Sequence, residues 1–514
     1  MSKFNTPRTP ESVSNKENGS SFLFTDPRFK LYMAIGSNLI ENQYYRTSNE
    51  SLEELREHIR NVSPEFAAKL AVYARRNMNL RSAPLALIVE LARVTSGNSI
   101  VSKGVEGVIR RADELSEAIS YYQYVNGTTS VGKLPKQLSK GIARAFNKFD
   151  LYQFSKYKGS NKSVSLRDAL FLTHPKPLTA DKATAFGMIA NDTLPPAVTW
   201  ESTHSVVGQE VKKETAEVKE AASRGAWEAL IAGQKMGYMA TLRNLRNFLD
   251  SDVSMESINK VDAFIRNQKA INSSQQFPWR FYTAARELET GELGWNDSKA
   301  QILYNSVINA SVQSLSNMTM FPQDEALLSV ADVSGSMRNK SLSAMGTITA
   351  AEVARFYGRM LSHCNPNSKY VEFATKTNFN ASRNPFEKID STTTGLGYGT
   401  DAHNVISEIL KRKESFDSIV IFTDNQFWNS EKSGPLSNLS VSNQFNELVN
   451  KYRKEVNSNM KLYLIALADY NKGAPVVLND KNFVVSGFTN DTFKTINNIH
   501  RSGDVIREIE AMEL

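Results

Sequence analysis

The chain has 514 residues, a hydrophobic fraction of 41%, a charged fraction of 22% and a net charge of +7. This composition is typical of a soluble globular protein, and the length exceeds what one hydrophobic core normally serves, so we expect at least two domains. No apolar run reaches the roughly 18 residues that a membrane-spanning helix needs, which argues against an integral membrane protein.

The N-terminus and the cysteine content both indicate a protein that stays in the cytoplasm. Residues 1–21 are polar and rich in Ser, Asn and Pro, so we expect a disordered lead-in without a secretory signal. Cys364 is the only cysteine, which rules out an internal disulfide and suits a reducing compartment. Because no histidine-rich constellation accompanies it, we expect a buried or incidental thiol and no catalytic nucleophile.

Residues 22–320 are predicted to form helix after helix. Phe66, Leu70 and Tyr73 recur at spacings of four and three, which places them on one face of a helix. A second amphipathic helix is expected through residues 87–91. Short helices in antiparallel pairs without an exact repeat favour an α-solenoid, whose concave surface suits a long ligand. An ordinary globular helical domain is the alternative.

The basic excess is concentrated in one stretch of this helical half. Residues 131–180 hold ten Lys and Arg side chains against Asp150 and Asp168. A local excess of this kind suits a polyanion, although most charge runs are simply solvated helical surfaces. Five basic residues recur every three or four positions, so we expect them to lie along one helical face as a phosphate-binding stripe: Lys133, Lys136, Lys140, Arg144 and Lys148.

Aromatic residues are interleaved with these basic ones. Their rings are candidates for stacking on nucleic-acid bases. We nevertheless favour the interpretation that these side chains lie in the core, opposite the basic stripe. The set comprises Phe146, Phe149, Tyr152, Phe154 and Tyr157.

From about residue 325 the pattern changes to strands that alternate with helices. The predicted strands lie in EALLSVAD, KYVEFAT, DSIVIFTDN, MKLYLIALAD and FVVSGF. The predicted helices span about 343–362, TDAHNVISEILKRK, NQFNELVNKYRKEV and a last segment that ends near Met512. This alternation indicates an α/β fold with a doubly wound, mostly parallel sheet.

Oxygen-bearing side chains follow three of the predicted strands at one edge of this sheet. Asp332, Ser334 and Ser336 form a D-x-S-x-S pattern after the first strand, Thr400 opens a helix, and Asp424 ends a later strand. Carboxylate and hydroxyl oxygens are ligands that Mg²⁺ prefers, so the set predicts a divalent-cation site. Taken singly, Thr400 could be a helix N-cap and Asp424 a turn residue.

Residues 325–514 resemble a von Willebrand A domain with a complete D-x-S-x-S…T…D set. In that family the two serines ligate the ion directly, and an acidic group of a partner often completes the coordination. Residues 131–178, with KQLSKGIARAFNKFDLYQFSKYKG and SLRDALFLTHPKP, are similar to the TROVE module shared by telomerase-associated, Ro and vault proteins. TROVE followed by an A domain over residues 22–514 resembles the Ro autoantigen family, and the Asn- and Lys-rich composition fits a bacterial or phage member.

The resemblance implies domains over residues 22–322 and 323–514, with HEAT-like helical repeats forming a ring that the A domain closes. It implies Y-like RNAs on a basic outer face and single-stranded 3′ ends of misfolded noncoding RNAs in the central hole. Bacterial relatives partner with exoribonucleases in RNA quality control. We expect a monomer without a membrane partner, because a ring closed within one chain needs no second copy.

The resemblance also singles out residues by position. His174 in LTHPKP matches the RNA-contacting histidine of the family, and we add its neighbour Lys176. SNKSVS departs from the family's glycine-tryptophan turn, which leaves open the register of the basic stretch and the preference for Y RNA. Read alone, His174 lies at a predicted helix end, where it can cap carbonyls. The stretch before it matches the family's basic stretch in role through Lys156, Lys158, Lys162 and Arg167.

Three functions remain in competition at this point. The favoured one is a noncatalytic RNA-binding scaffold. A metal-dependent nuclease is disfavoured because carboxylates are sparse, the six histidines do not cluster, and no G-x-x-x-x-G-K-[ST] loop is present. The third is a protein-adhesion scaffold in which the A domain binds an acidic partner through its metal and the helical half has no RNA function.

Overall fold

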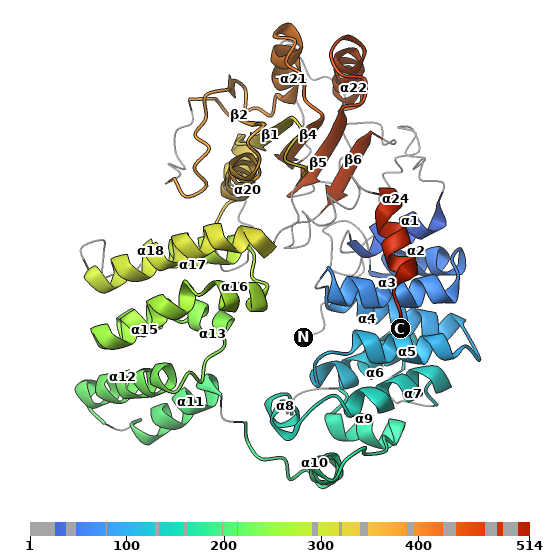
Figure 1. Ribbon diagram of the computed structural model, residues 1–514, viewed down its shortest axis with the longest axis vertical. Helices are drawn as coiled ribbons and strands as arrows, with labels where there is room; N and C mark the ends of the chain where they lie inside the picture. Colours follow the sequence, from blue (N-terminus) through green and yellow to red (C-terminus); the bar gives the residue numbers. More distant parts are fainter. Residues whose placement is uncertain are drawn as a thin grey trace. The chain divides into compact units, whose positions relative to one another are not determined.

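The computed structural model describes residues 26–36, 48–78, 80–128, 133–158, 163–197, 199–212, 214–289, 297–317, 321–339, 348–387, 395–424, 438–467, 481–486 and 502–514. The predicted lead-in over residues 1–21 lies outside the described residues. The chain divides into two compact units (Figure 1). The first unit comprises Met1–Val108, Gly132–Gly141 and Met320–Leu514, and the second comprises Ile109–Val131 and Ile142–Thr319.

Apart from the helices that flank its sheet, the first unit contains helices from both ends of the chain. They are α1 (Pro27–Gly36), α2 (Ser48–Arg60), α3 (Pro64–Arg76), α4 (Ser82–Val94), α5 (Ser99–Val108) and α24 (Ser502–Ala511). α3 packs against α4 and α5. The predicted face of Phe66, Leu70 and Tyr73 is buried on α3, which confirms this prediction. Ser63 caps the helix by accepting a hydrogen bond from the Phe66 N–H at 3.1 Å.

α4 is a helix as predicted, but it is not amphipathic. Every residue from Ala83 to Ala92 is buried, so the helix is covered on all sides. This burial includes the carboxylate of Glu90, whose Oε2 lies 3.0 Å from the Nε of Arg56 and 2.7 Å from an Nη of Arg93. A buried carboxylate is tolerated only when such partners neutralise it.

Replacing Glu90 with Gln should therefore destabilise the protein. The substitution leaves Arg56 and Arg93 without their shared counter-ion, and we expect a loss of about 2 kcal/mol in the free energy of unfolding. This value is below that of a fully buried pair, because both arginine side chains keep some access to solvent. Urea unfolding followed by circular dichroism measures the difference, and an unchanged midpoint would contradict the role given to Glu90.

The remainder of the first unit is built on a six-stranded sheet with the order β3-β2-β1-β4-β5-β6. The strands are β1 (Leu327–Asp332), β2 (Ser368–Phe373), β3 (Thr377–Asn378), β4 (Ser418–Thr423), β5 (Lys461–Ala466) and β6 (Asn482–Ser486). All neighbours are parallel except β2 and β3. The five predicted strands and the doubly wound topology are confirmed. The two-residue β3 was not predicted, because it is too short to produce a periodic pattern.

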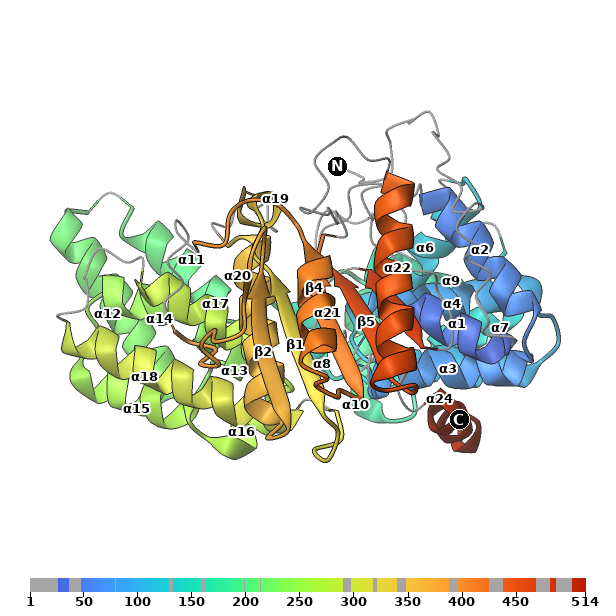
Figure 2. The same cartoon turned by 90° about the horizontal axis from the view of Figure 1, so that it is seen from above.

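Helices cover both faces of this sheet, as Figure 2 shows. They are α20 (Ala350–Cys364), α21 (Ala402–Lys411) and α22 (Asn438–Glu455), whereas the short α19 (Gly335–Asn339) follows the end of β1. On β1, Leu328 and Val330 belong to a core that includes residues of α21 and α22. Ser329 between them points the other way and donates its hydroxyl to the Gly358 carbonyl of α20 at 2.8 Å. The predicted helix over 343–362 corresponds to α20, and residues 340–347 lie outside the described part of the chain.

The C-terminal helix α24 packs against α1 and α3, near the start of the chain (Figure 1). An Nη of Arg28 on α1 lies 2.6 Å from Oε1 of Glu510, and Nζ of Lys69 on α3 donates to the Glu510 carbonyl at 2.7 Å. Val505, Ile506 and Ile509 supply the apolar face of α24 and are buried. Both ends of the described chain are therefore tied into the first unit.

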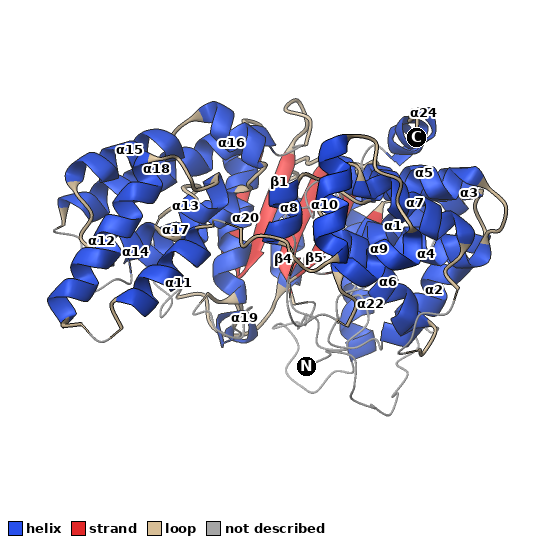
Figure 3. Ribbon diagram, turned by 90° about the horizontal axis from the view of Figure 1, so that it is seen from below, coloured by secondary structure: helices blue, strands red, loops and turns tan. Residues whose placement is uncertain are grey.

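All regular structure described in the second unit is helical, as the colours of Figure 3 show. Its helices are α6 (Asp113–Val125), α8 (Leu151–Lys156), α9 (Leu166–Thr173), α10 (Ala180–Ala190), α11 (Trp200–Glu210), α12 (Ala216–Ala232), α13 (Tyr238–Arg243), α14 (Leu245–Asp250), α15 (Met255–Ile265), α16 (Gln268–Ser274), α17 (Pro278–Glu289), α18 (Ser298–Gln313) and the 3₁₀ turn η2 (Ser314–Asn317). The helix α7 (Lys136–Phe146) begins in the first unit and ends in the second. Consecutive helices such as α11 and α12 pack together, and α15 contacts both α12 and α18. This layering agrees with the predicted array of helical hairpins.

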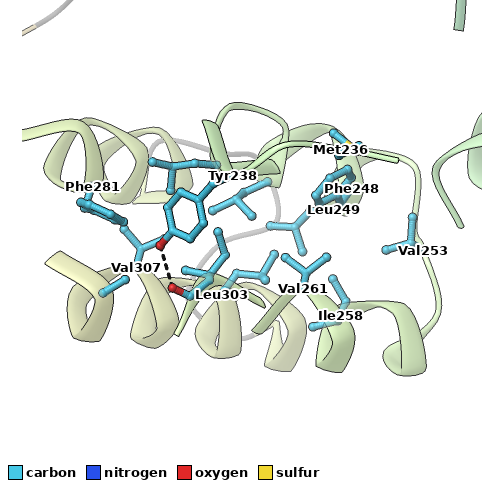
Figure 4. Close-up of a cluster of buried hydrophobic side chains, with 14 of the residues drawn as sticks. Met236, Tyr238, Phe248, Leu249, Val253, Ile258, Val261, Phe281, Leu303 and Val307 are labelled. Carbon is cyan, nitrogen blue, oxygen red and sulfur yellow. Dashed lines mark hydrogen bonds between the residues drawn. The ribbon is translucent and has the colours of Figure 1, made fainter. Parts of the chain in front are cut away.

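An extended apolar cluster of the second unit joins residues of α12 through α18 (Figure 4). Tyr238 is buried in it, and its hydroxyl donates a hydrogen bond to the Ile265 carbonyl at 2.7 Å, a partner that a buried phenol requires. Burial raises the pKa of Tyr238 well above its usual value, so the phenol keeps the proton that it donates.

The aromatic residues of the basic stretch mostly belong to a core, as predicted. Phe146, Phe149 and Phe154 are buried, and the ring centroids of Phe146 and Phe154 lie 6.0 Å apart. Tyr157 is half-buried and lies against the Arg111 guanidinium, 4.7 Å from the ring centroid. Tyr152 departs from the prediction, because 51% of its surface is exposed.

Two sequence-based expectations concern single features of the chain. Burial raises the pKa of the Cys364 thiol to about 12, so the thiol stays protonated at neutral pH. None of the described helices is both long enough and apolar enough to cross a membrane.

Candidate functional site

The carboxyl ends of β1, β2 and β4 meet at one edge of the sheet because the three strands are parallel neighbours. Asp332 is the last residue of β1, and Asp424 directly follows Thr423 at the end of β4. Both carboxylates are buried, with 0% and 1% of their surfaces exposed. This edge is where open α/β sheets bind their ligands.

Hydrogen bonds fix the carboxylate of Asp332 from two sides. Its Oδ1 accepts from the Ser334 N–H at 2.9 Å, and its Oδ2 accepts from the Thr423 hydroxyl at 2.7 Å. The hydroxyl oxygens of Ser334 and Ser336 lie 3.2 Å apart, at the start of α19. The D-x-S-x-S turn therefore gathers one carboxylate and two hydroxyls within a single bend of the chain.

The loop that carries Thr400 is joined to the D-x-S-x-S turn. The Gly335 N–H donates to the Tyr398 carbonyl at 2.9 Å, and an Nη of Arg338 donates to the Gly397 carbonyl at 2.6 Å. Gly397 has a φ of +87°, a backbone conformation that favours glycine. Thr400 is buried beside this contact.

The structure assigns the helix N-cap near Thr400 to a different residue. Asp401 occupies the N-cap position of α21, without a side-chain capping bond. Its N–H donates to the Ala374 carbonyl just after β2 at 2.9 Å. The capping alternative for Thr400 is therefore wrong, and its hydroxyl is not required to start the helix.

The two buried carboxylates carry an electrostatic penalty. Burial, and after it the negative charge of Asp424, raises the pKa of the Asp332 carboxyl well above its usual range. A divalent cation would offset both effects, and the donor set of carboxylate and hydroxyl oxygens suits Mg²⁺. At no place in the described ranges, this sheet edge included, do three or more His, Cys, Asp or Glu side chains form a group that could hold a metal ion.

Thr423 is a member of this site that the sequence analysis missed. Its hydroxyl orients Asp332 across two neighbouring strands, a contact between positions 91 residues apart in the chain. The available signal was a hydroxyl residue directly before Asp424 at the end of a buried strand. Such a position reads equally well as an ordinary strand end, so periodicity alone could not reveal the bond.

The second candidate site is the basic stripe. Fewer of its residues lie on the helix in the structure than the sequence predicted. Lys136, Lys140 and Arg144 share one exposed face of α7. Lys133 precedes the helix, since α7 begins only at Lys136. Pro135 explains this start, because a helical conformation is disfavoured for the residue before a proline. Lys148 follows the helix end. The prediction that all five lie along one helical face is wrong at its two ends.

Two of the predicted RNA-contacting lysines make structural contacts. Nζ of Lys148 donates to the Ile109 carbonyl at 2.9 Å. Nζ of Lys158 lies 3.0 Å from Oδ1 of Asp192 and also donates to its carbonyl at 3.2 Å. Lys156 is exposed at the end of α8, and Lys162 lies outside the described residues.

Arg167, Phe171 and His174 lie at spacings of four and three along α9 and at its end. Arg167 and His174 are exposed, and half of the Phe171 surface, 50%, reaches solvent. His174 is the C-cap residue in the left-handed conformation, with φ 47° and ψ 59°, and its N–H donates to the Leu170 carbonyl at 2.9 Å. The predicted helix end at His174 is confirmed, and the backbone of His174 provides the cap.

The segment after α9 is held in place by the turn after α7. The side-chain amide of Asn147 donates to the Lys176 carbonyl at 3.0 Å and accepts from the Leu178 N–H at 3.0 Å. Lys176 is exposed. These bonds bring the end of α7 and the end of α9 together within the second unit.

Comparison with known proteins agrees with this architecture. The TROVE domain model matches residues 33–225 and 200–325, and the Ro60 vWA domain model matches residues 326–500. The crystal structure of the Deinococcus radiodurans Ro (RSR) protein aligns with a TM-score of 0.65 at 16% identity, covering 93% of this chain and 100% of that chain. At this identity the likeness shows the fold alone, and it confirms the predicted combination of helical and α/β parts.

Two curated relatives match over part of the chain. Telomerase protein component 1 of Mus musculus is 21% identical over 378 residues, and that of Rattus norvegicus is 22% identical over 307 residues. The matches cover 60% and 46% of this chain, but only 14% and 12% of those much longer relatives. The TROVE match alone spans more than half of the chain and is followed by the Ro-type A domain. The chain therefore belongs to the Ro family.

Proposed function

We propose that this protein is a noncatalytic RNA-binding protein. It holds small noncoding, Y-like RNAs on a basic outer face that includes the exposed side of α7, with Arg167 and His174 as further contacts. It also holds single-stranded 3′ ends of structured or misfolded RNAs, for RNA quality control or processing together with an exoribonuclease. Membership of the Ro family supports the proposal, and the charge arrangement around α7 carries it.

The decisive observation is that the two carboxylates within residues 131–180 do not neutralise the positive charge of this stretch. Asp150 and Asp168 are the carboxylates of residues 131–180. Asp150 accepts from the Gln153 N–H at the start of α8, and Asp168 accepts from the Ser165 N–H at the start of α9. Both therefore serve as helix caps. Within the described part of the chain, Lys136 and Lys140 form no ion pair and remain available to phosphates.

A binding experiment with two matched RNAs tests the proposal. One is a structured RNA with a single-stranded 3′ tail, and the other is the same RNA with a blunt end. We expect tighter binding of the tailed RNA, an affinity that falls steeply with salt, and recovery of both RNAs intact after incubation with Mg²⁺. Weak binding that ignores the tail would contradict the RNA-holding function, and turnover of the RNA would favour the nuclease alternative.

We propose that the sheet edge is a metal-ion-dependent adhesion site. The proposed ligands of the divalent cation, Mg²⁺, are Asp332, Ser334, Ser336, Thr400 and Asp424, which hold it directly or through water. With few carboxylates around it, the ion would keep an open position for an acidic group of a partner protein. Adhesion to such a partner is the second candidate function, and it is compatible with RNA binding elsewhere on the chain.

The domain boundaries are part of the proposal. We place the RNA-binding domain at residues 22–322 and the A domain at residues 323–514. We also propose a monomer, because a ring of helical repeats that the A domain closes within one chain, as the family resemblance implies, needs no second copy.

A further inference from the structure

One exposed aromatic side chain on α9 lies one helical turn from a basic residue. The buried face of the helix consists of Leu166, Ala169, Leu170 and Thr173, and the helix packs against α6 and α10. Phe171 is on the opposite face with half of its surface exposed, between Arg167 one turn before and His174 one turn after. A phenylalanine gains nothing from solvent at this position, and the core behind the helix is already filled by other residues.

The guanidinium of Arg167 lies over the ring of Phe171, with its central carbon 5.6 Å from the ring centroid. An Arg and Phe pair four residues apart supports an isolated helix only slightly. The pair also arranges two recognition groups side by side: a cation for phosphate and an apolar ring with a π-face. Bases stack on such rings without regard to their identity.

The charge of Arg167 is not cancelled by its neighbour Asp168. Oδ2 of Asp168 accepts hydrogen bonds from the Ser165 N–H at 2.8 Å and from the Ser165 hydroxyl at 2.7 Å. The carboxylate is therefore committed to the N-terminus of α9, where it completes a capping box. Arg167 keeps its charge for an outside anion.

The chain after Phe171 is held in a defined conformation. His174 takes a left-handed conformation at the helix end, and Asn147 binds the backbone at Lys176 and Leu178. A surface fixed in this way loses little conformational entropy when a ligand binds. Cationic or titratable side chains thus flank the exposed ring on both sides along the chain.

We propose that Phe171 stacks on an unpaired nucleobase while Arg167 contacts an adjacent phosphate. In this role Phe171 makes the surface prefer RNA with an unpaired nucleotide beside a duplex over a uniform duplex. This inference rests on the proposed RNA-binding function and refines it, because phosphate contacts alone do not distinguish paired from unpaired nucleotides.

The test compares a hairpin RNA that carries one bulged adenine with the same hairpin without the bulge. Wild type should prefer the bulged RNA, and Phe171→Ala should lower the affinity for it about tenfold. Affinity for the unbulged hairpin and the salt dependence of binding should stay as in wild type. Phe171→Trp should retain the preference and Phe171→Leu should lose it, because stacking needs an aromatic ring.

A fluorescent base at the bulge separates stacking from a general loss of binding. With 2-aminopurine in place of the bulged adenine, saturating wild type should quench the fluorescence, and saturating Phe171→Ala should not. The control is Phe264→Ala, which removes a partly exposed (36%) aromatic ring on α15 and should bind both hairpins as wild type does. Melting temperatures confirm that each variant is folded.

The outcomes distinguish this inference from the function on which it rests. If Phe171→Ala binds both hairpins as wild type does, while charge reversal on α7 abolishes binding, RNA binding stands and the stacking role is overturned. If neither change affects binding, the proposed function fails as well.

Discussion

Replacing Lys136, Lys140 and Arg144 with glutamate should weaken RNA binding about a hundredfold at physiological salt, because three phosphate contacts become three repulsions. The three side chains share one exposed face of α7, so a phosphate backbone that follows this helix meets all of them. The plot of log affinity against log salt should become less steep by about three, one counterion for each lost contact. Fluorescence anisotropy with a tailed RNA at several salt concentrations measures both quantities.

A matched variant separates a local surface from the overall charge of the protein. Reversing Lys411, Lys451 and Lys454, which are exposed on α21 and α22, changes the net charge by the same amount. It should leave the affinity and the salt dependence close to those of wild type. Equal losses in the two triple variants would show that RNA senses only the net charge, and the assignment of the site to α7 would fail.

The basic stripe shows how far spacing alone can carry a prediction. The spacing of four residues placed Lys136, Lys140 and Arg144 on one helical face, which is correct. The same rule included Lys133 and Lys148, because a charge pattern does not reveal where a helix begins or ends. It also could not reveal that Lys148 is bonded to the Ile109 carbonyl, a contact between segments 39 residues apart.

The sheet was predictable because its signals are local. Buried parallel strands are continuous apolar runs, and Asp332 and Asp424 each follow such a run directly. Parallel order then brings the ends of β1 and β4 to one edge. The hydrogen bond of Thr423 to Asp332 was not predictable, because it depends on the register between these strands.

Hydrophobic periodicity also could not predict that a helix would be buried on all sides. The prediction gave the helix that contains residues 87–91 one apolar face, yet α4 is covered around its whole circumference. Its one acid, Glu90, reads as a solvent-facing residue in the sequence. Its partner Arg56 is 34 residues away, so only the tertiary structure shows why a carboxylate is tolerated there.

Replacing Asp332 with Asn should remove the response of the protein to Mg²⁺. In wild type we expect Mg²⁺ to raise the free energy of unfolding by about 2.7 kcal/mol at a hundredfold excess over the dissociation constant. The asparagine side chain would keep the shape and the hydrogen bond from the Ser334 N–H, but it lacks the charge that attracts the cation. Thermal unfolding in Mg²⁺ and in EDTA measures the difference for each protein.

The result in EDTA distinguishes lost metal binding from damage to the fold. Asp332→Asn removes the repulsion between two buried carboxylates, so without divalent cations the variant should be at least as stable as wild type. The control Ser329→Ala, on the same strand, breaks the hydrogen bond to Gly358 and should lower stability equally in Mg²⁺ and in EDTA. If the ion binds at Asp332, the Asn variant should be at least as stable as wild type in EDTA and less stable than wild type in Mg²⁺. The Ala variant should be less stable than wild type in both buffers. A wild type that gains nothing from Mg²⁺ would contradict the proposed metal site but would leave the proposed RNA-binding function untested by this experiment and open to its own test.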